Sequence, residues 1–169
     1  MNKVIAALVF SGFIVGCAGP HYSGRAIDPQ PEPSTYEVVV VTDSETKPGF
    51  LDAITNWLND NNYTYSVVPD HSQHDFDKLT LEYVGRWAWD LAIYLSEARV
   101  EGFHGGQRVG SVEYRAPNTL SGAKFGNAAE RVNYMLEVLF GRLTSEEATQ
   151  IVNASPERRE RREEVYDFD

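Results

Sequence analysis

Cysteine is almost absent from this chain of 169 residues: it has a single one, Cys17, so no intramolecular disulfide can stabilise the fold. Positive charge is also scarce, because 15 Lys and Arg residues face 25 Asp and Glu residues and the formal net charge is −10. That balance disfavours nucleic acid, or an anionic membrane surface, as the main partner. The longest nearly apolar run, residues 4–15, falls short of the roughly 20 residues that a membrane-spanning helix needs. Because no intramolecular disulfide can form, the fold must be held by its hydrophobic core alone.

The N-terminal segment has the layout of a secretory signal peptide. Lys3 precedes the apolar run, and the run ends in Ile-Val-Gly-Cys at 14–17. This ending resembles the bacterial lipobox, in which the cysteine sulfur receives a diacylglycerol and the new N-terminus is acylated, typically with palmitate. Ala18 follows the cysteine, and the absence of Asp there favours export to the outer membrane. We therefore expect a lipidated Cys17; the alternatives are a signal peptide with an unmodified cysteine and a short membrane anchor.

Composition divides the chain into four parts. We expect a lipoprotein signal peptide over 1–16, followed over 17–35 by the lipidated cysteine and a proline-rich tether, because proline-rich stretches are extended and semi-stiff. A single domain should then occupy 36–143, and a short helix with a charged tail should occupy 144–169.

Hydrophobic periodicity predicts the elements of that domain. Four consecutive valines within 36–42 indicate a strand that is buried on both faces. A helix after Pro48 and a strand over 63–68 complete a crossover unit, which makes the two strands parallel. Further strands at short intervals indicate an antiparallel meander, and a long amphipathic helix should begin near Phe125. The predicted fold is α+β with two layers: a mixed five-stranded sheet in βαββββα order, two main helices on one face and a short C-terminal helix. The remaining elements are strands at 79–83, 91–100 and 107–114, and the last helix at 145–153, with Thr144 and Glu147 as a capping box.

Two tryptophans form the densest local signature. Trp87 and Trp89 are two residues apart and should point the same way on an extended chain, with Arg86 and Asp90 on either side. Paired aromatic residues on strands are usually packed, so we favour a core platform at a strand junction. An aromatic groove for a sugar or a peptide is the open alternative, which makes these four residues candidate binding residues. Trp57 is expected in the core on the apolar face of its helix.

The segment 83–114 carries an Arg-Trp-x-Trp-Asp-Leu-Ala-x-Tyr run and a glycine hairpin. Together with the helix start at 124–126 and the helix end at 139–140, it resembles a family of small, uncharacterised proteobacterial outer-membrane lipoproteins, the Sbal type. The resemblance covers about 36–143 and implies an envelope lipoprotein without known enzymatic activity, so it supplies no catalytic residues. Members often carry a cysteine pair in the domain, which this chain lacks, and the tail after the domain is longer than in the family.

One loop offers a weak alternative. Residues 70–77 gather two histidines and three carboxylates, and on a helical turn His71 and His74 would share a face with Asp75 nearby, as in a zinc or copper site. A third ligand is missing unless His104 or His21 approaches, so we expect no metal and no cofactor. The strand carboxylates Glu82, Glu97, Glu101 and Glu113 are read as a solvated face.

These observations predict a lipid-anchored protein of the outer membrane that faces the periplasm. We expect a non-catalytic binding or assembly module with an envelope protein as partner, contacting it through the sheet face or the edge near Trp87 and Trp89. The membrane is contacted through the lipid on Cys17, and nucleic acid is not a partner. The alternative is a metal-dependent or hydrolytic envelope enzyme that uses the 70–77 loop.

Overall fold

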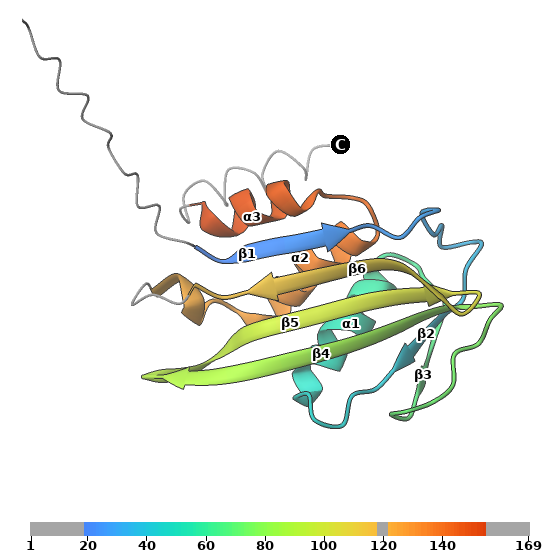
Figure 1. The fold of residues 1–169 in the computed structure, drawn as a ribbon, viewed down its shortest axis with the longest axis horizontal. Coiled ribbons are helices and arrows are strands. Elements are labelled where there is room, and N and C mark those ends of the chain that lie inside the picture. Colours follow the sequence, from blue (N-terminus) through green and yellow to red (C-terminus); the bar gives the residue numbers. More distant parts are fainter. Residues whose placement is uncertain (1–18, 118–121, 155–169) are drawn as a thin grey trace, which may run out of the picture.

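The computed structural model describes residues 19–117 and 122–154, so the predicted signal peptide, Cys17 and the tail from residue 155 lie outside the described residues. The fold is α+β, as predicted, with a mixed sheet in the order β1-β6-β5-β4-β2-β3. Figure 1 shows the elements, which are β1 (His21–Arg25), β2 (Val38–Val41), α1 (Pro48–Asp60), β3 (Tyr65–Val68), β4 (Leu79–Asp90), β5 (Ala92–His104), β6 (Gln107–Arg115), the 3-10 helix η1 (Gly122–Phe125), α2 (Ala128–Leu139) and α3 (Ser145–Asn153).

The predicted crossover unit is confirmed. All four valines of β2 are buried, and β2 pairs in parallel with both β3 and β4. Helix α1 begins at Pro48, whose fixed φ suits the first turn of a helix. Its buried residues recur at the helical period and turn one face to the sheet: Phe50, Ala53, Ile54, Trp57 and Leu58.

The predicted meander is also present, but its strands are longer than expected. β4 continues to Asp90 instead of ending near Tyr83, and the chain reverses at Leu91 to form β5. β5 and β6 are joined through Gly105 and Gly106, whose φ angles of 58° and 75° suit glycine. The tryptophan segment therefore lies near the end of a long β4–β5 hairpin rather than at a strand junction.

The sheet has six strands, so the prediction of five is wrong. The additional strand is β1, which lies where the proline-rich composition had indicated a tether. β1 pairs antiparallel with β6, with Tyr22 opposite Tyr114, and Tyr22 is only 1% exposed. Ile27 and Pro31 further along the same segment are buried as well. Too few apolar residues occur between the prolines to produce a recognisable period, so this strand gives no clear sequence signal.

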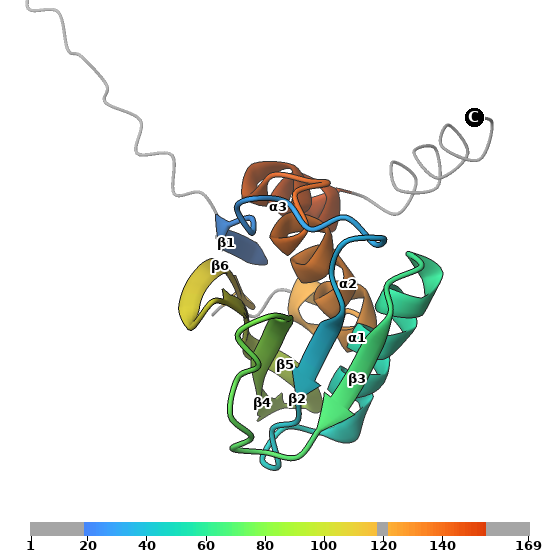
Figure 2. The ribbon, with the colours of Figure 1, turned by 90° about the vertical axis from the view of Figure 1, so that its right-hand side faces the viewer.

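The helices cover one face of the sheet and leave the other largely open, as Figure 2 shows. α1 and α2 pack against each other, and α2 also contacts β5 and β6. α2 begins at Ala128, capped by Asn127, rather than near Phe125 as predicted, because Phe125 belongs to η1. The capping box at Thr144 is confirmed: its Oγ1 accepts from Glu147 N, and Glu147 Oε2 accepts from Thr144 N.

Helix α3 protects the outer edge of β1. Thr149 Oγ1 accepts a hydrogen bond from the Tyr22 amide at 3.0 Å. Ser145 Oγ donates to the Gly24 carbonyl at 3.2 Å, and Asn153 Nδ2 donates to the Pro20 carbonyl at 2.8 Å. An edge strand normally exposes unpaired backbone groups, and these side chains satisfy some of them.

Candidate functional site

The two paired tryptophans have different environments. The register places Trp87 opposite Leu95 and Trp89 opposite Ile93, so the two tryptophans lie on the same face of the hairpin, as predicted. This is the helix side, because the Trp87 ring contacts Phe50 of α1. Trp87 is half-buried against the core, where its ring meets Phe50 edge-on at 6.4 Å. Lys47 Nζ lies 5.2 Å from the centre of the Trp87 ring, within the range of a cation–π contact. Trp89, in contrast, is 73% exposed, so the expectation of a packed pair holds for only one of its members.

Gly85 makes room for the half-buried Trp87 ring. A Cβ at this position would lie 2.9 Å from atoms of both Trp87 and Phe50, closer than carbon atoms approach each other. The β4–β5 register also shifts between Arg86 and Trp87, where Ser96 is the extra residue on β5. Such a bulge bends a strand and changes the direction of the residues beyond it. The last part of the hairpin, from Trp87 onward, is thus set off from the regular sheet.

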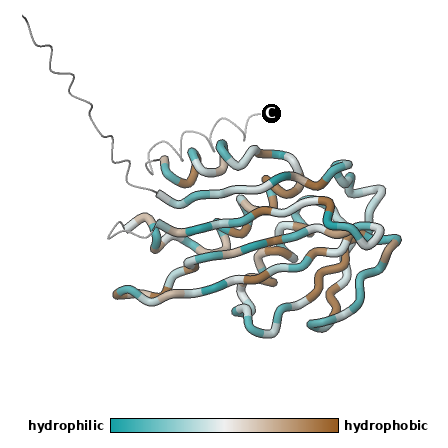
Figure 3. The backbone as a smooth tube through the Cα atoms, in the orientation of Figure 1, coloured by the Kyte–Doolittle hydropathy of each residue, from teal (hydrophilic) through white to brown (hydrophobic). Residues whose placement is uncertain are grey.

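The end of this hairpin is an exposed apolar cluster. Leu91 is 86% exposed and Ile93 is 61% exposed, and together with Trp89 they form what we call the hairpin tip. Figure 3 shows the hydrophobic colour at this left-hand end of the β4–β5 hairpin. Leu91 has a φ of 64°, a left-handed conformation that is costly for a side chain of this kind. Large apolar side chains gathered on an exposed tip are typical of a contact site for another surface.

The hairpin tip is tied to the neighbouring 3-10 helix. Asp90 pairs with Lys124, and the Lys124 side chain is 5% exposed. Lys124 Nζ also lies 5.5 Å from the Tyr94 ring centre and 5.4 Å from that of Phe125. The carboxylate of Asp90 therefore joins the hairpin to η1.

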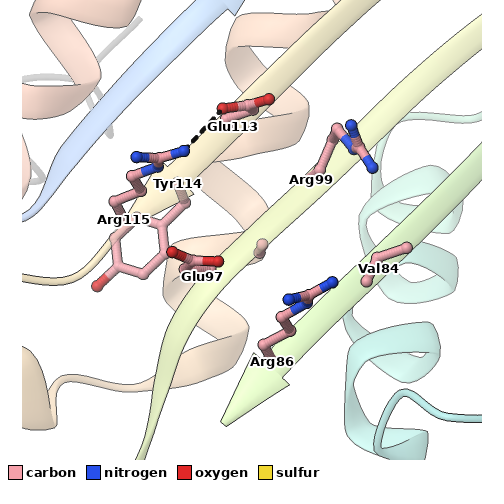
Figure 4. Close-up of a pocket in the computed structure, with 8 residues that line it drawn as sticks. Val84, Arg86, Glu97, Arg99, Glu113, Tyr114 and Arg115 are labelled. Atoms are coloured by element: carbon pink, nitrogen blue, oxygen red, sulfur yellow. Dashed lines mark ion pairs between the residues drawn. The ribbon is translucent and has the colours of Figure 1, made fainter. Parts of the chain in front are cut away.

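A second surface is the open face of the sheet, opposite the helices. Exposed or half-exposed charged residues of β4, β5 and β6 lie in register there: Arg86 is opposite Glu97, and Glu97 is opposite Arg115. The next row holds Arg99 opposite Glu113. These five residues, which we call the charged face, line a shallow hollow that Figure 4 shows. Charges of opposite sign alternate across it, which is a favourable arrangement for cross-strand neighbours.

The strand carboxylates that the sequence predicts on a solvated face lie on this side of the sheet. Glu82 and Glu101 are directly opposite each other, an unfavourable pairing for like charges. Each has a partner: His74 Nε2 lies 2.8 Å from Glu82 Oε1, and Arg108 donates to Glu101 Oε1 at 2.6 Å. Arg99 adds a second ion pair to Glu101 at 3.6 Å.

The 70–77 loop does not assemble the alternative metal site. His71 points into solvent with a 94% exposed side chain, whereas His74 packs on Phe103 with ring centres 4.5 Å apart. Asp75 accepts from the Asp77 amide, and His104 packs edge-on against Tyr36. Within residues 19–117 and 122–154, no three His, Cys, Asp or Glu side chains gather as a metal site would require.

Asp70 is the most strongly bonded carboxylate of that loop. It accepts hydrogen bonds from the Ser44 hydroxyl at 2.7 Å and from the Ser44 amide at 3.1 Å. The Ser44 hydroxyl bond is the main reason that the pKa of Asp70 lies below its usual range, and the amide bond adds to it. Both bonds join the loop after β3 to the loop after β2, so this carboxylate has a structural task.

The comparisons with known proteins add little. No protein-family model and no curated protein sequence matches the chain. Among solved structures, a dodecamer of a PelC point variant from Paraburkholderia phytofirmans is similar, with a TM-score of 0.47 and 12% sequence identity over 72% of this chain and 95% of that chain. Similarity at this level carries no functional information. Within the described residues, no helix is both long and apolar enough to cross a membrane.

Proposed function

We propose that this protein is a lipid-anchored, non-catalytic binding or assembly module of the cell envelope, held at the periplasmic side of the outer membrane and similar to the Sbal-type lipoproteins. The observation that carries the proposal is the charged face. One side of β4, β5 and β6 bears no helix and presents alternating Arg and Glu side chains around a shallow hollow.

This array suits a protein partner better than a small molecule. Its hollow is shallow, whereas small-molecule sites are mostly enclosed and apolar. Arg86 and Glu97 stand opposite each other, but no ion pair joins either of them to a described residue within 4.0 Å. Their charges are therefore available to a partner, and arginine is enriched in protein interfaces.

The anchor in this proposal is the lipid on Cys17. The motif at 14–17 supports it. Cys17→Ser should leave the signal uncleaved or release the protein from the membrane fraction. Mass spectrometry of the purified protein should show a diacylglyceryl and an acyl group on Cys17. A Cys17→Ser protein of mature size that still needs detergent for extraction would contradict the lipid anchor.

The binding role can be tested by crosslinking in the envelope. A photoreactive phenylalanine analogue in place of Glu97 should capture one defined partner, and the charge reversal Arg86→Glu should suppress that product. The matched control carries the same analogue in place of Asn56, which is exposed on the helix side of the molecule. Equal products from both positions, or none from position 97, would count against the charged face as the binding surface.

A further inference from the structure

We infer that the hairpin tip, formed by Trp89, Leu91 and Ile93, inserts into the interfacial layer of the membrane that holds the lipid anchor. This inference rests on the lipid anchor of the proposed function and adds the orientation of the domain on the bilayer. It assigns a lipid surface, rather than a protein, as the occupant of the tip.

The sheet register brings the tip and the start of the domain to the same end. Arg86 is opposite Glu97, Glu97 is opposite Arg115, and Arg115 is opposite His21, so one row crosses β4, β5, β6 and β1. β4 and β5, β5 and β6, and β6 and β1 are all antiparallel neighbours, so β1 runs opposite to β4. The chain before His21 and the chain after Arg86 therefore leave this row in the same direction. Figure 1 shows the N-terminal end of β1 and the end of the β4–β5 hairpin on the same left-hand side.

Trp89 and Cys17 can lie at similar distances from that row. Trp89 follows Arg86 by three residues, which is about 10 Å along a strand. Cys17 precedes His21 by four residues, and four residues span at most about 14 Å. Acyl chains on Cys17 would therefore hold this end of the domain close to the bilayer, at a distance that the tip itself can cross.

The chemistry of the tip fits a lipid interface. Tryptophan concentrates at membrane–water interfaces because its ring is apolar and its indole N–H can still contact water. Leu91 and Ile93 add exposed apolar surface at this end of the hairpin. At Leu91, whose φ is 64°, a turn residue such as Asn or Gly would be less strained. The chain is too acidic for attraction to anionic lipid to be the driving force. Insertion should therefore depend on apolar burial and change little with salt.

Quenching by brominated lipids tests this directly. The full chain, purified from membranes, is reconstituted in zwitterionic phosphatidylcholine vesicles with bromine on the acyl chains, and its tryptophan emission is measured. We expect strong quenching that is largely lost in Trp89→Phe, while Trp57→Phe retains it because Trp57 is buried. Adding anionic lipid or salt should change the quenching by less than about twofold.

A fluorophore at the far end provides the matched control. Phe76 is exposed, and its carbonyl accepts from the Gly105 amide at the β5–β6 turn, the opposite end of the hairpin strands. The double variant Trp89→Phe/Phe76→Trp therefore moves an exposed indole away from the predicted membrane side. Its added indole should not be quenched, and quenching equal to that of the wild type would overturn the orientation.

The outcomes separate the anchor from the tip. Mass spectrometry of the same sample reports whether Cys17 is lipidated. A lipidated protein without quenching of Trp89 overturns this inference and leaves the proposed anchor intact, whereas quenching without lipidation supports the tip and contradicts the anchor. A protein that shows neither lipid on Cys17 nor quenching of Trp89 overturns both the anchor and the tip. If sedimentation instead shows a self-associated species in which Trp89 is shielded without vesicles, a second copy of the chain covers the tip and the inference fails.

Discussion

Trp89 on β4 lies directly opposite Ile93 on β5, and both side chains are largely exposed. The next pair on the same face of the hairpin, Trp87 and Leu95, is packed against the core. The boundary between core and solvent therefore falls between two consecutive cross-strand pairs with similar residues. Composition does not separate these pairs, but the position of α1, whose Phe50 meets Trp87, does.

The different burial of Trp57 and Trp89 predicts a large cost for one tryptophan substitution and a small cost for the other. Trp57 is 5% exposed, its Nε1 donates to Glu137 Oε1 at 2.6 Å, and its ring packs on Phe140 at 4.7 Å. Trp57→Ala should lower the free energy of unfolding by about 3–5 kcal/mol because it leaves a cavity. Trp89→Ala should change it by less than about 0.5 kcal/mol. Urea unfolding followed by circular dichroism checks both, and similar losses in the two variants would contradict the placement of the rings.

The strand β1 predicts a second contrast between neighbours. Tyr22 is buried between Tyr114 and Tyr134, whereas the adjacent His21 is exposed. Tyr22→Ala should cost about 3–5 kcal/mol in the free energy of unfolding, as for other large aromatic truncations in a core. His21→Ala should stay within about 0.5 kcal/mol of the wild type. If the two variants melt together, residues 21–25 act as a tether and are not part of the sheet.

Buried tyrosines should make the fold sensitive to alkaline pH. Burial raises the pKa of the Tyr22 hydroxyl, and it raises the pKa of Tyr114 as well. A raised pKa means that the folded state holds the proton more tightly than the unfolded chain, whose tyrosines titrate near pH 10. The stabilisation is thus complete below about pH 10 and is lost progressively as the pH rises above it.

Urea unfolding at pH 8 and at pH 11 measures this loss. The wild type should lose more free energy of unfolding between the two pH values than Tyr22→Phe, which has no proton to release at this position. At pH 8 the variant should lose only about 0.5–1.5 kcal/mol, since it lacks the hydrogen bond from the Tyr22 hydroxyl to the Arg131 carbonyl. An equal pH response in both proteins would contradict a role for Tyr22.

Replacing Leu91 in the hairpin tip by a polar residue should raise the free energy of unfolding, although it removes exposed apolar surface. Leu91→Asn places a residue that tolerates a left-handed backbone at φ 64°, so the free energy of unfolding should rise by up to about 1 kcal/mol. Ile93→Asn is the control: it removes similar apolar surface from a regular strand position and should lower stability by up to about 1 kcal/mol. Thermal unfolding of both variants decides the matter, and a loss in both would indicate that Leu91 is not strained.

Local patterns in the sequence were sufficient for several elements. The four valines of β2, the apolar face of α1 and the capping box at Thr144 all depend on residues within a few positions of one another. The backbone fixes which side chains of a strand or a helix share a face, so these signals are readable from a few neighbouring positions without knowledge of the tertiary structure. The parallel pairing of β2 with β3 followed from the same local patterns, because a helix between two strands requires a crossover.

The tertiary structure alone decided the membership of β1 and the exposure of the tip. The Tyr22 amide is bonded to Thr149, 127 residues away, and no local pattern reports such a partner. Backbone geometry makes Trp87 and Trp89 face the same side, and their spacing in the sequence predicted this correctly. Which of the two is covered depends on where the helical layer ends, and that is set by contacts between elements distant in the sequence. For the same reason the sequence grouped Arg86, Trp87, Trp89 and Asp90 as candidate binding residues. The folded chain separates them: Trp87 packs against the core, Arg86 lies on the charged face, Asp90 pairs with Lys124 and Trp89 belongs to the hairpin tip.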